Sequence, residues 1–370
     1  MELARIPVRR IALRLVEGID STLLVLILSL CMLGFAALFS ASYDSPGRVL
    51  NQCVSLSIAL TAMWLTAQMT PQTLMRFAVP AYVAGIVLLV LVALFGDVVN
   101  GARRWLNIGV ARFQPSEMLK LAVPLMLAWY FHRREATLRL RDFALAGLLL
   151  GVPVGLILRQ PDLGTASLVG AAGFYVIFFA GISWRVLGGL AGLFALALFP
   201  LWGMLHDYQR RRVLTLLDPT QDPLGAGYHI IQSTIAVGSG GISGKGWLNG
   251  TQAHLEFIPE RHTDFIFAVY SEEFGLIGNL VLLVLYALLI GRGLVIAANA
   301  ATLFARLMAG SVTLMFFTYA FVNMGMVSGI LPVVGVPLPF LSYGGTALLT
   351  LFIGAGILMS VQRHRKLVQT

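Results

Sequence analysis

The chain has 370 residues, of which 58% are hydrophobic and only 12% are charged, and its formal net charge is +9. An ordinary soluble domain has about 25% charged residues, so this composition excludes a soluble protein. A β-barrel is also excluded, because its strands alternate apolar and polar residues, whereas 86–95 and 280–289 are apolar on every face. The sequence therefore predicts an all-α protein, a polytopic transmembrane helical bundle.

Apolar segments follow one another along the chain, each near the length of about 20 residues that a helix needs to cross a bilayer. The first follows an arginine-bearing leader and is too long for a signal-peptide core, so we interpret it as an uncleaved span. We predict one integral membrane domain, 1–370, with about ten spans at 21–41, 51–69, 77–96, 117–132, 143–158, 165–182, 185–205, 265–290, 305–327 and 343–361.

The positions of the basic residues support an even number of spans, because Lys and Arg favour cytoplasmic loops. Both ends of the chain are basic, and Arg133, Arg134, Arg139 and Arg141 then fall on the same side as the ends. We therefore expect both termini in the cytoplasm. A long loop, 206–263, is expected between spans seven and eight on the outer side.

A second group of cations lies on the outer side in this topology, against the usual bias. Positive charge in that position is typical of a site for an anionic partner. The alternative for any one cation is a loop salt bridge with a nearby carboxylate. The group consists of Arg103, Arg104, Arg112, Arg159, Arg210, Arg211, Arg212, Lys245 and Arg261.

Two ionisable residues stand at the start of the fourth predicted span. Pro115 suits the first helical turn, so Glu117 comes early in the helix and Lys120 lies on the same face three residues later. We predict that the two side chains touch. They either line a functional cavity or form an ion pair that offsets the cost of burial.

Asp264 stands where the outer loop meets the apolar residues of the eighth span, beside Arg261 and His262. A partly desolvated carboxylate in such a place is what a general base for a sugar hydroxyl requires. A helix N-cap is the alternative.

Two irregular segments flank this region. The glycine-rich run 238–246 fits neither the Walker A nor the Rossmann spacing, so we expect tight turns, with backbone amides open to an anion as a further option. The run 328–345 is apolar but contains Pro332, Pro337 and Pro339, so it cannot be one regular helix. We expect it to line the outer cavity, or else to be a plain outer loop.

Several motifs together resemble the SEDS family (shape, elongation, division and sporulation proteins), and the resemblance covers nearly the whole chain. Arg261 before His-Thr-Asp and the short termini resemble the elongation branch more than the division branch. The motifs are Arg104–Leu106, Arg112–Glu117 with Lys120, Arg159–Thr165, Asp207–Arg210, Asp218–Pro219, Asp222–His229, Gly244–Trp247, Glu260–Phe267, Glu272–Glu273 and Pro332–Leu338.

The resemblance implies an inverting glycosyltransferase at the outer face of the bacterial inner membrane that polymerises lipid II, with release of undecaprenyl diphosphate, for elongation and rod shape. It also implies that Asp264 is essential and that Glu117 and Lys120 are important. A divalent cation (Mg²⁺ or Mn²⁺), a class B penicillin-binding protein of the PBP2 type and the elongation machinery are the implied cofactor and partners, with no nucleic acid.

We therefore predict that Asp264 is the catalytic residue and that Glu117 and Lys120 support the cavity. The alternatives are a lipid II flippase or transporter, a polymerase of the division branch, and a non-catalytic scaffold. The candidates for binding the substrate diphosphate are Arg103, Arg104, Arg159, Arg210, Arg211, Lys245 and Arg261.

Overall fold

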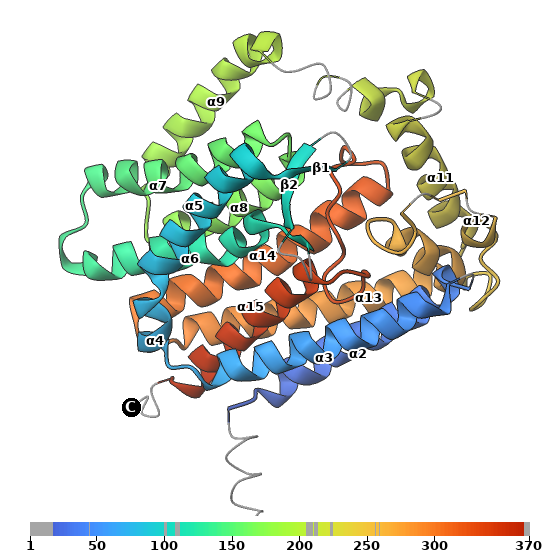
Figure 1. Ribbon diagram of the computed structural model, residues 1–370, viewed down its shortest axis with the longest axis horizontal. Coiled ribbons are helices and arrows are strands. Elements are labelled where there is room, and N and C mark those ends of the chain that lie inside the picture. Colours follow the sequence, from blue (N-terminus) through green and yellow to red (C-terminus); the bar gives the residue numbers. More distant parts are fainter. Residues whose placement is uncertain are drawn as a thin grey trace, which may run out of the picture.

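The computed structural model describes residues 18–43, 45–99, 102–107, 112–204, 210, 214–222, 225–255, 257–258 and 260–365. In this part of the chain long helices form a bundle (Figure 1). Each predicted span coincides with one helix. These helices are α2 Ser21–Ala41, α3 Pro46–Gln68, α5 Ala78–Phe95, α6 Pro115–Arg133, α7 Leu140–Arg159, α8 Leu163–Phe179, α9 Trp184–Met204, α13 Ile266–Ala298, α14 Leu303–Val327 and α15 Thr346–Arg363.

Short-range signals set where several of these helices begin. The Asp20 side chain accepts a hydrogen bond from the Leu23 amide at 2.8 Å and so caps α2. Asp162 caps α8 in the same way through the Thr165 amide at 3.0 Å. Pro115 occupies the first turn of α6, where its missing N–H costs no helical hydrogen bond.

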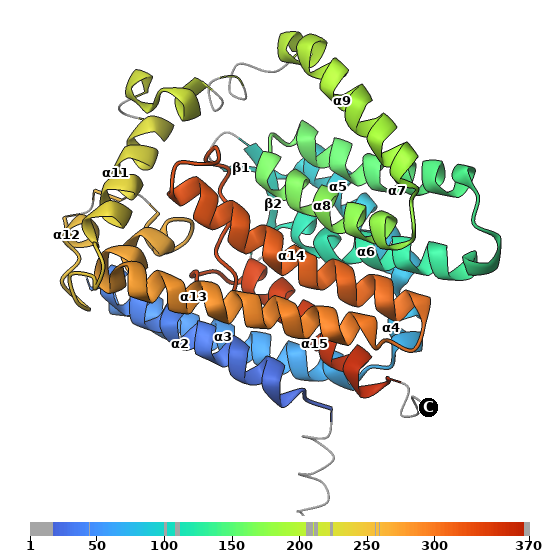
Figure 2. The same cartoon turned by 180° about the vertical axis from the view of Figure 1, so that it is seen from behind.

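Helix α14 lies at the centre of the bundle. It packs against α13 and α8, which run beside it in both views (Figures 1 and 2), and it also contacts α6. Helix α15 packs along α3, and α2 packs along α13. Since α14 and α15 are mostly buried, the surface that faces outward comes largely from the other helices.

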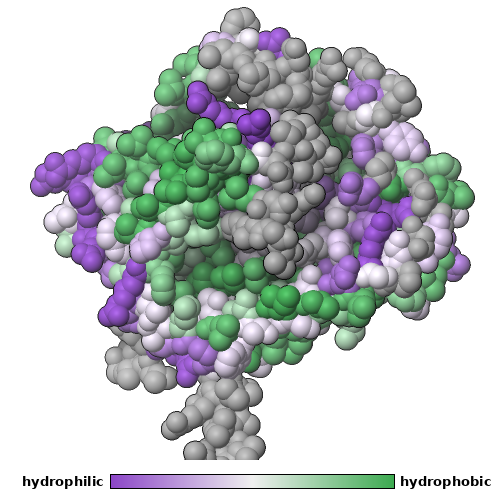
Figure 3. All heavy atoms as spheres, in the orientation of Figure 1, coloured by the Kyte–Doolittle hydropathy of each residue, from purple (hydrophilic) through white to green (hydrophobic). Residues whose placement is uncertain are grey.

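The apolar surface agrees with a membrane environment. By length and composition, seven helices of the described chain can each cross a bilayer, and α8 and part of α9 are shorter apolar helices. Figure 3 shows broad apolar areas on the left half and along the lower part of the visible face, with hydrophilic side chains at its left edge and in its right half. The chain is a multi-pass membrane protein, and the ten-span count stays a prediction.

The first and last long helices meet at one end of the bundle. The Arg292 guanidinium near the end of α13 pairs with the carboxylate of Asp20, which caps α2. A Cβ built on Gly18 would lie 2.9 Å from the Arg363 guanidinium at the end of α15. The described ends of the chain therefore share one side, as the charge pattern predicts.

The structure also differs from the prediction. Helix α13 continues to Ala298 instead of ending near 290. The predicted loop 206–263 contains the helices α11 Ala226–Ser239 and α12 Thr251–His254 and the 3₁₀ helix η2 Pro219–Gln221, because its apolar residues pack on the bundle. A small antiparallel sheet, β1 Asp97–Val99, β2 Ala102–Asn107 and β3 Arg112–Phe113, is added to the helical class. The remaining short helices are α4 Pro71–Arg76 and η1 Glu135–Thr137.

The glycine-rich run packs on a kink near the start of α13. Gly275 has φ +62° and ψ −159°, a conformation that is essentially restricted to glycine. At the kink the amides of Leu276 and Ile277 donate to Gly241 and Ile242 carbonyls at 3.0 and 3.1 Å. The Lys245 amide donates to the Glu272 carbonyl at 3.0 Å, so this amide is not open to an anion.

Candidate functional site

Asp264 lies two residues before α13, at the outer end predicted for the eighth span. The first residue flanking the helix is Phe265, and no side chain caps it, so Asp264 is not the N-cap. The Asp264 side chain is half-buried. Burial raises its pKa to about 6, and the negative charge of Glu260 adds to the increase. A carboxyl group with this pKa can accept a proton at neutral pH and release it again.

The irregular segment 328–345 holds Asp264 from one side. The buried Asn323 amide of α14 donates to the Asp264 carbonyl at 2.8 Å and to the Val336 carbonyl at 2.7 Å. Ser342 Oγ donates to the Thr263 carbonyl at 2.6 Å. A Cβ built on Gly335 would lie 3.3 Å from Asp264 Oδ2. Segment 328–345 therefore packs beside the Asp264 carboxylate, and its predicted role in lining a cavity stays a prediction.

The end of α2 and the start of α3 hold the same loop from the other side. Arg261 is buried, donates through Nε to the Ala41 carbonyl at 2.9 Å and lies over the Tyr43 ring. His262 Nε2 pairs with the guanidinium of Arg48. The backbone around Asp264 is thus fixed from two directions, which is a requirement for a preorganised catalytic group.

Segment 328–345 also contacts the start of α8. A Cβ on Gly164 would lie 2.5 Å from the Val334 carbonyl, so only glycine permits this approach. Next to it, Asp162 Oδ2 accepts from Gln114 Nε2 at 3.0 Å and lies 3.9 Å from Arg104 Nε. The segment therefore connects the Asp264 loop to a polar cluster at the ends of α6 and α8.

Glu117 and Lys120 form the predicted contact inside the bundle. Lys120 Nζ lies 2.5 Å from Glu117 Oε1 and 2.5 Å from the Tyr319 hydroxyl of α14, and Lys120 is only 2% exposed. Glu117 Oε2 is buried without a hydrogen-bond partner among the described residues. The ion pair therefore leaves one carboxylate oxygen available to a further donor.

Glu117 also lines an apolar cavity of about 470 Å³. Glu117 is the one charged side chain among the described residues that line it. Such a wall suits a long hydrocarbon chain with a polar group at one end. The lining residues are Thr66, Met69, Leu74, Phe77, Ala81, Glu117, Met118, Leu121, Ala122, Leu125, Met308, Thr346, Leu349, Thr350, Ile353 and Ile357.

Comparisons with known proteins identify the family. The model of the FtsW/RodA/SpoVE family, described as "Cell cycle protein", matches residues 21–367. This chain belongs to that family. The resemblance predicted from the motifs is therefore confirmed.

The relatives within the FtsW/RodA/SpoVE family include named enzymes. The chain is 52% identical to the peptidoglycan glycosyltransferase MrdB of Escherichia coli K12, over 95% of both chains. It is 33% identical to the peptidoglycan glycosyltransferase RodA of Treponema pallidum, over 95% of this chain and 99% of that one. A probable FtsW enzyme of Geobacter metallireducens is 34% identical, over 96% and 98%.

Two solved structures share the fold of this family member. One belongs to a peptidoglycan synthase complex that coordinates polymerisation and crosslinking, with TM-score 0.81, 39% identity and coverage of 94% of this chain and 99% of that one. The other is the rod shape determining protein RodA of Thermus thermophilus, with TM-score 0.71, 34% identity and coverage of 94% and 97%.

In this family member the predicted diphosphate-binding cations fall into two groups. Four of them, Arg104, Lys245, Arg261 and Arg210, are engaged by described residues of the protein. Arg104 binds the Gln160 carbonyl at 3.2 Å, Lys245 pairs with Glu272 at 2.6 Å, and Arg261 is buried as described above. Arg210 also donates to the Gly203 carbonyl at 2.6 Å.

Two others, Arg103 and Arg159, are available to a ligand. Arg103 and Arg159 are exposed, and no described residue pairs with them. Arg211, Arg212 and the side chain of Arg112 lie outside the part of the chain that the structure describes. The alternative that a nearby carboxylate pairs with the cation therefore applies to Lys245 and not to Arg103 or Arg159.

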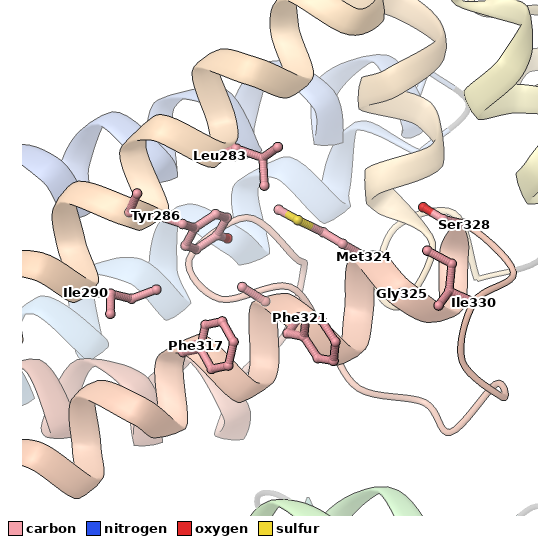
Figure 4. A pocket seen from close by; sticks show the side chains of 11 residues that line it. Leu283, Tyr286, Ile290, Phe317, Phe321, Met324, Gly325, Ser328 and Ile330 are labelled. Atoms are coloured by element: carbon pink, nitrogen blue, oxygen red, sulfur yellow. The ribbon is translucent and has the colours of Figure 1, made fainter.

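A separate groove of about 360 Å³ lies between α13 and α14 (Figure 4). Leu283, Tyr286 and Ile290 line it from α13, and Phe317, Phe321 and Met324 line it from α14. No Asp, Glu, His, Lys or Arg lines this groove among the described residues. It can hold apolar groups, and the hydroxyl of Tyr286, its one ionisable group among the described lining residues, already donates to the Pro339 carbonyl at 2.6 Å.

Several residues that complete the site were not predicted, namely Asn323, Tyr319, Ser342 and Arg48. The available signal for Asn323 is that an amide within an apolar helix usually has a buried partner. Nothing in the sequence identified that partner, since Asn323 and Asp264 are 59 positions apart.

Proposed function

We propose that this chain is a peptidoglycan glycosyltransferase of the elongation type, which polymerises lipid II into β-1,4 glycan strands. The similarity to named enzymes supports the activity. The observation that carries the mechanism is the half-buried Asp264 carboxylate, whose pKa is raised to about 6 on a backbone fixed by Asn323.

In the proposed reaction Asp264 accepts the proton of the GlcNAc 4-hydroxyl of the acceptor. The hydroxyl oxygen forms a bond to the anomeric carbon of the donor MurNAc, and the bond from that carbon to the diphosphate oxygen breaks. Undecaprenyl diphosphate leaves with the bonding electrons, and attack from the opposite face converts the α-linked donor to a β-1,4 product.

The leaving diphosphate gains negative charge, so fixed cations near it would lower the barrier. Arg103 and Arg159 are the best candidates among the predicted cations because the protein does not already engage them. Glu117, Lys120 and the apolar cavity beside them are proposed to hold the lipid-linked end of a substrate.

A divalent cation is a further proposal. Among the described residues no three His, Cys, Asp or Glu side chains lie close enough together to hold a metal ion. The described residues alone therefore offer no side-chain cluster for a resident metal. Mg²⁺ is often bound by one or two carboxylates and by substrate phosphates, and the steps above are written without it.

We propose a bacterial inner-membrane location with ten spans, cytoplasmic termini and an outward-facing site. The sidedness rests on the positive-inside rule. A class B penicillin-binding protein is the proposed partner for crosslinking. The similar synthase complex, whose description combines polymerisation with crosslinking, supports this proposal.

Purified protein incubated with lipid II tests the proposed activity. We expect glycan polymer from the parent protein and none from Asp264→Ala at equal folded amounts. A lipid II flippase is the second candidate because broken apolar segments are typical of transporters. Proteoliposomes that move lipid II across the bilayer without making glycan would favour the flippase and reject the polymerase.

A further inference from the structure

His229 of α11 lies beside the Asp264 loop and has no part in the mechanism above. Its imidazole ring stacks on Phe265, the residue after Asp264, with ring centroids 5.5 Å apart and an interplanar angle of 21°. Nδ1 of His229 is buried and has no hydrogen-bond partner among the residues that the structure describes. A buried polar atom without a partner is unfavourable, so a ligand that supplies one would gain this interaction.

The position of His229 is set by the packing of α11 on the bundle. Ser233 Oγ, one turn further along α11, donates to the Val327 carbonyl of α14 at 2.9 Å, and Ile230 is 5% exposed. Helix α11 also packs against α13. The imidazole is therefore held in place from the helix side and from the Phe265 side.

The charges around His229 select the kind of ligand. Burial lowers the His229 pKa, while Glu260 and Asp222 oppose this decrease through their negative charges, and the net direction is downward. The imidazole is thus neutral at neutral pH. With Asp264 close in sequence to the stacked Phe265, these carboxylates disfavour a phosphate and favour an uncharged polar group.

We propose that His229 is a substrate-binding residue, whose Nδ1 hydrogen bonds to a hydroxyl or acetamido group of the acceptor sugar. This inference rests on the proposed function and adds the binding of the sugar that Asp264 deprotonates. A neutral imidazole can serve as donor or acceptor at Nδ1, which suits both sugar groups. An aromatic ring with a polar atom on its edge is also a common sugar-binding surface.

The test measures lipid II affinity in an Asp264→Asn background, so that turnover does not change the ligand. His229→Phe keeps the stacked ring and removes the hydrogen bond, so we expect affinity to fall about tenfold with no decrease in the thermal unfolding midpoint. His229→Gln restores a hydrogen-bonding group and should bind within about threefold of the background protein. Ser239→Ala, which loses only a bond within α11 to the Ala236 carbonyl, is the matched control.

Equal affinity of the Phe variant and the background protein would overturn the proposal. The proposal would also be overturned if His229→Gln bound lipid II as weakly as His229→Phe does. The hydrogen-bonding group would then not restore the affinity. Failure of the proposed function looks different. If Asp264→Asn polymerises lipid II while His229→Phe still weakens binding, the catalytic assignment is wrong and the His229 assignment stands.

Discussion

Asn323 connects Asp264 to the segment that covers it. Its amide donates to the Asp264 carbonyl at 2.8 Å and to the Val336 carbonyl at 2.7 Å, and the residue is 0% exposed. One side chain thus fixes the backbone of the proposed base and the backbone of the irregular segment against each other. The geometry of the site depends on this bridge.

Asn323→Leu removes both donors while keeping the side-chain volume. The buried Val336 carbonyl loses its partner at a cost of about 1–3 kcal/mol, and the part-buried Asp264 carbonyl loses its partner as well. We therefore expect a lower thermal unfolding midpoint and slower polymerisation. Thr318→Val on the same helix, which loses its contact with Tyr175, should retain activity. An unchanged midpoint and rate in Asn323→Leu would show that the bridge is dispensable.

Substitutions of Lys120 and Glu117 can distinguish a structural role of this ion pair from a functional one. Lys120→Met leaves a buried carboxylate uncompensated, and losses of about 3–5 kcal/mol are typical of such a change. The double variant Glu117→Gln, Lys120→Met has no buried charge at these positions and should recover most of the unfolding midpoint without recovering polymer synthesis. Full activity of the double variant would limit the pair to a structural role.

Gly275 stands at the kink of α13 in a conformation that is essentially restricted to glycine. A Cβ there would lie 2.3 Å from the Gly244 amide nitrogen, on a backbone with φ +62°. Gly275→Ala should lower the yield of folded protein, since the backbone conformation alone costs about 1–3 kcal/mol. Gly291→Ala in the same helix meets nothing within 4 Å and should be neutral or slightly stabilising. Equal thermal unfolding midpoints for the two variants would contradict the observed kink.

Asp264 gives a pH dependence with a definite sign. Its folded pKa of about 6 lies above the ordinary 3.8, so the folded state holds the proton more tightly than the unfolded chain. The contribution of the protonated Asp264 to the free energy of unfolding is therefore complete below about pH 4. This contribution is lost as the pH rises through about 6. Asp264→Asn should therefore unfold at a higher temperature than the parent at neutral pH, and the gap should vanish near about pH 4. A difference between the two unfolding temperatures that does not change with pH would contradict the raised pKa of Asp264.

The outer cations should respond differently to substitution. Arg261 is buried against Ala41 and Tyr43, so Arg261→Ala should lower the unfolding midpoint. Arg103 and Arg159 are exposed, so Arg103→Ala and Arg159→Ala should leave the midpoint unchanged and weaken lipid II affinity. Binding assays at several salt concentrations measure this, because removing a contact with the diphosphate also reduces the salt dependence. Unaltered affinity in both variants would remove them as candidates.

Hydropathy located the long helices well because crossing a bilayer imposes a length and an apolar composition on each segment. The same signal could not show that α13 continues to Ala298, or that the loop 206–263 contains α11, since neither follows from span length. The small β1–β3 sheet was also not predicted, because its strands are short and lie between two helices.

The site was predictable only where its contacts are local. The Lys120–Glu117 contact follows from helical spacing of three residues. The Tyr319 hydroxyl that completes it is 199 positions from Lys120, and no periodicity relates the two. The partner of Lys245 was likewise not predicted, because Glu272 lies 27 positions away, and the role of Lys245 toward a diphosphate stays a prediction.

The central claim is that Asp264 is the general base. The most direct test is the rate of lipid II polymerisation by purified Asp264→Asn, with Glu260→Gln as the matched control. Asp264→Asn preserves the side-chain shape and the carbonyl bound by Asn323, and we expect it to fold normally and to lose activity by at least about 10²-fold. Glu260→Gln should retain most of the activity. Polymer made at the parent rate by folded Asp264→Asn would contradict the account.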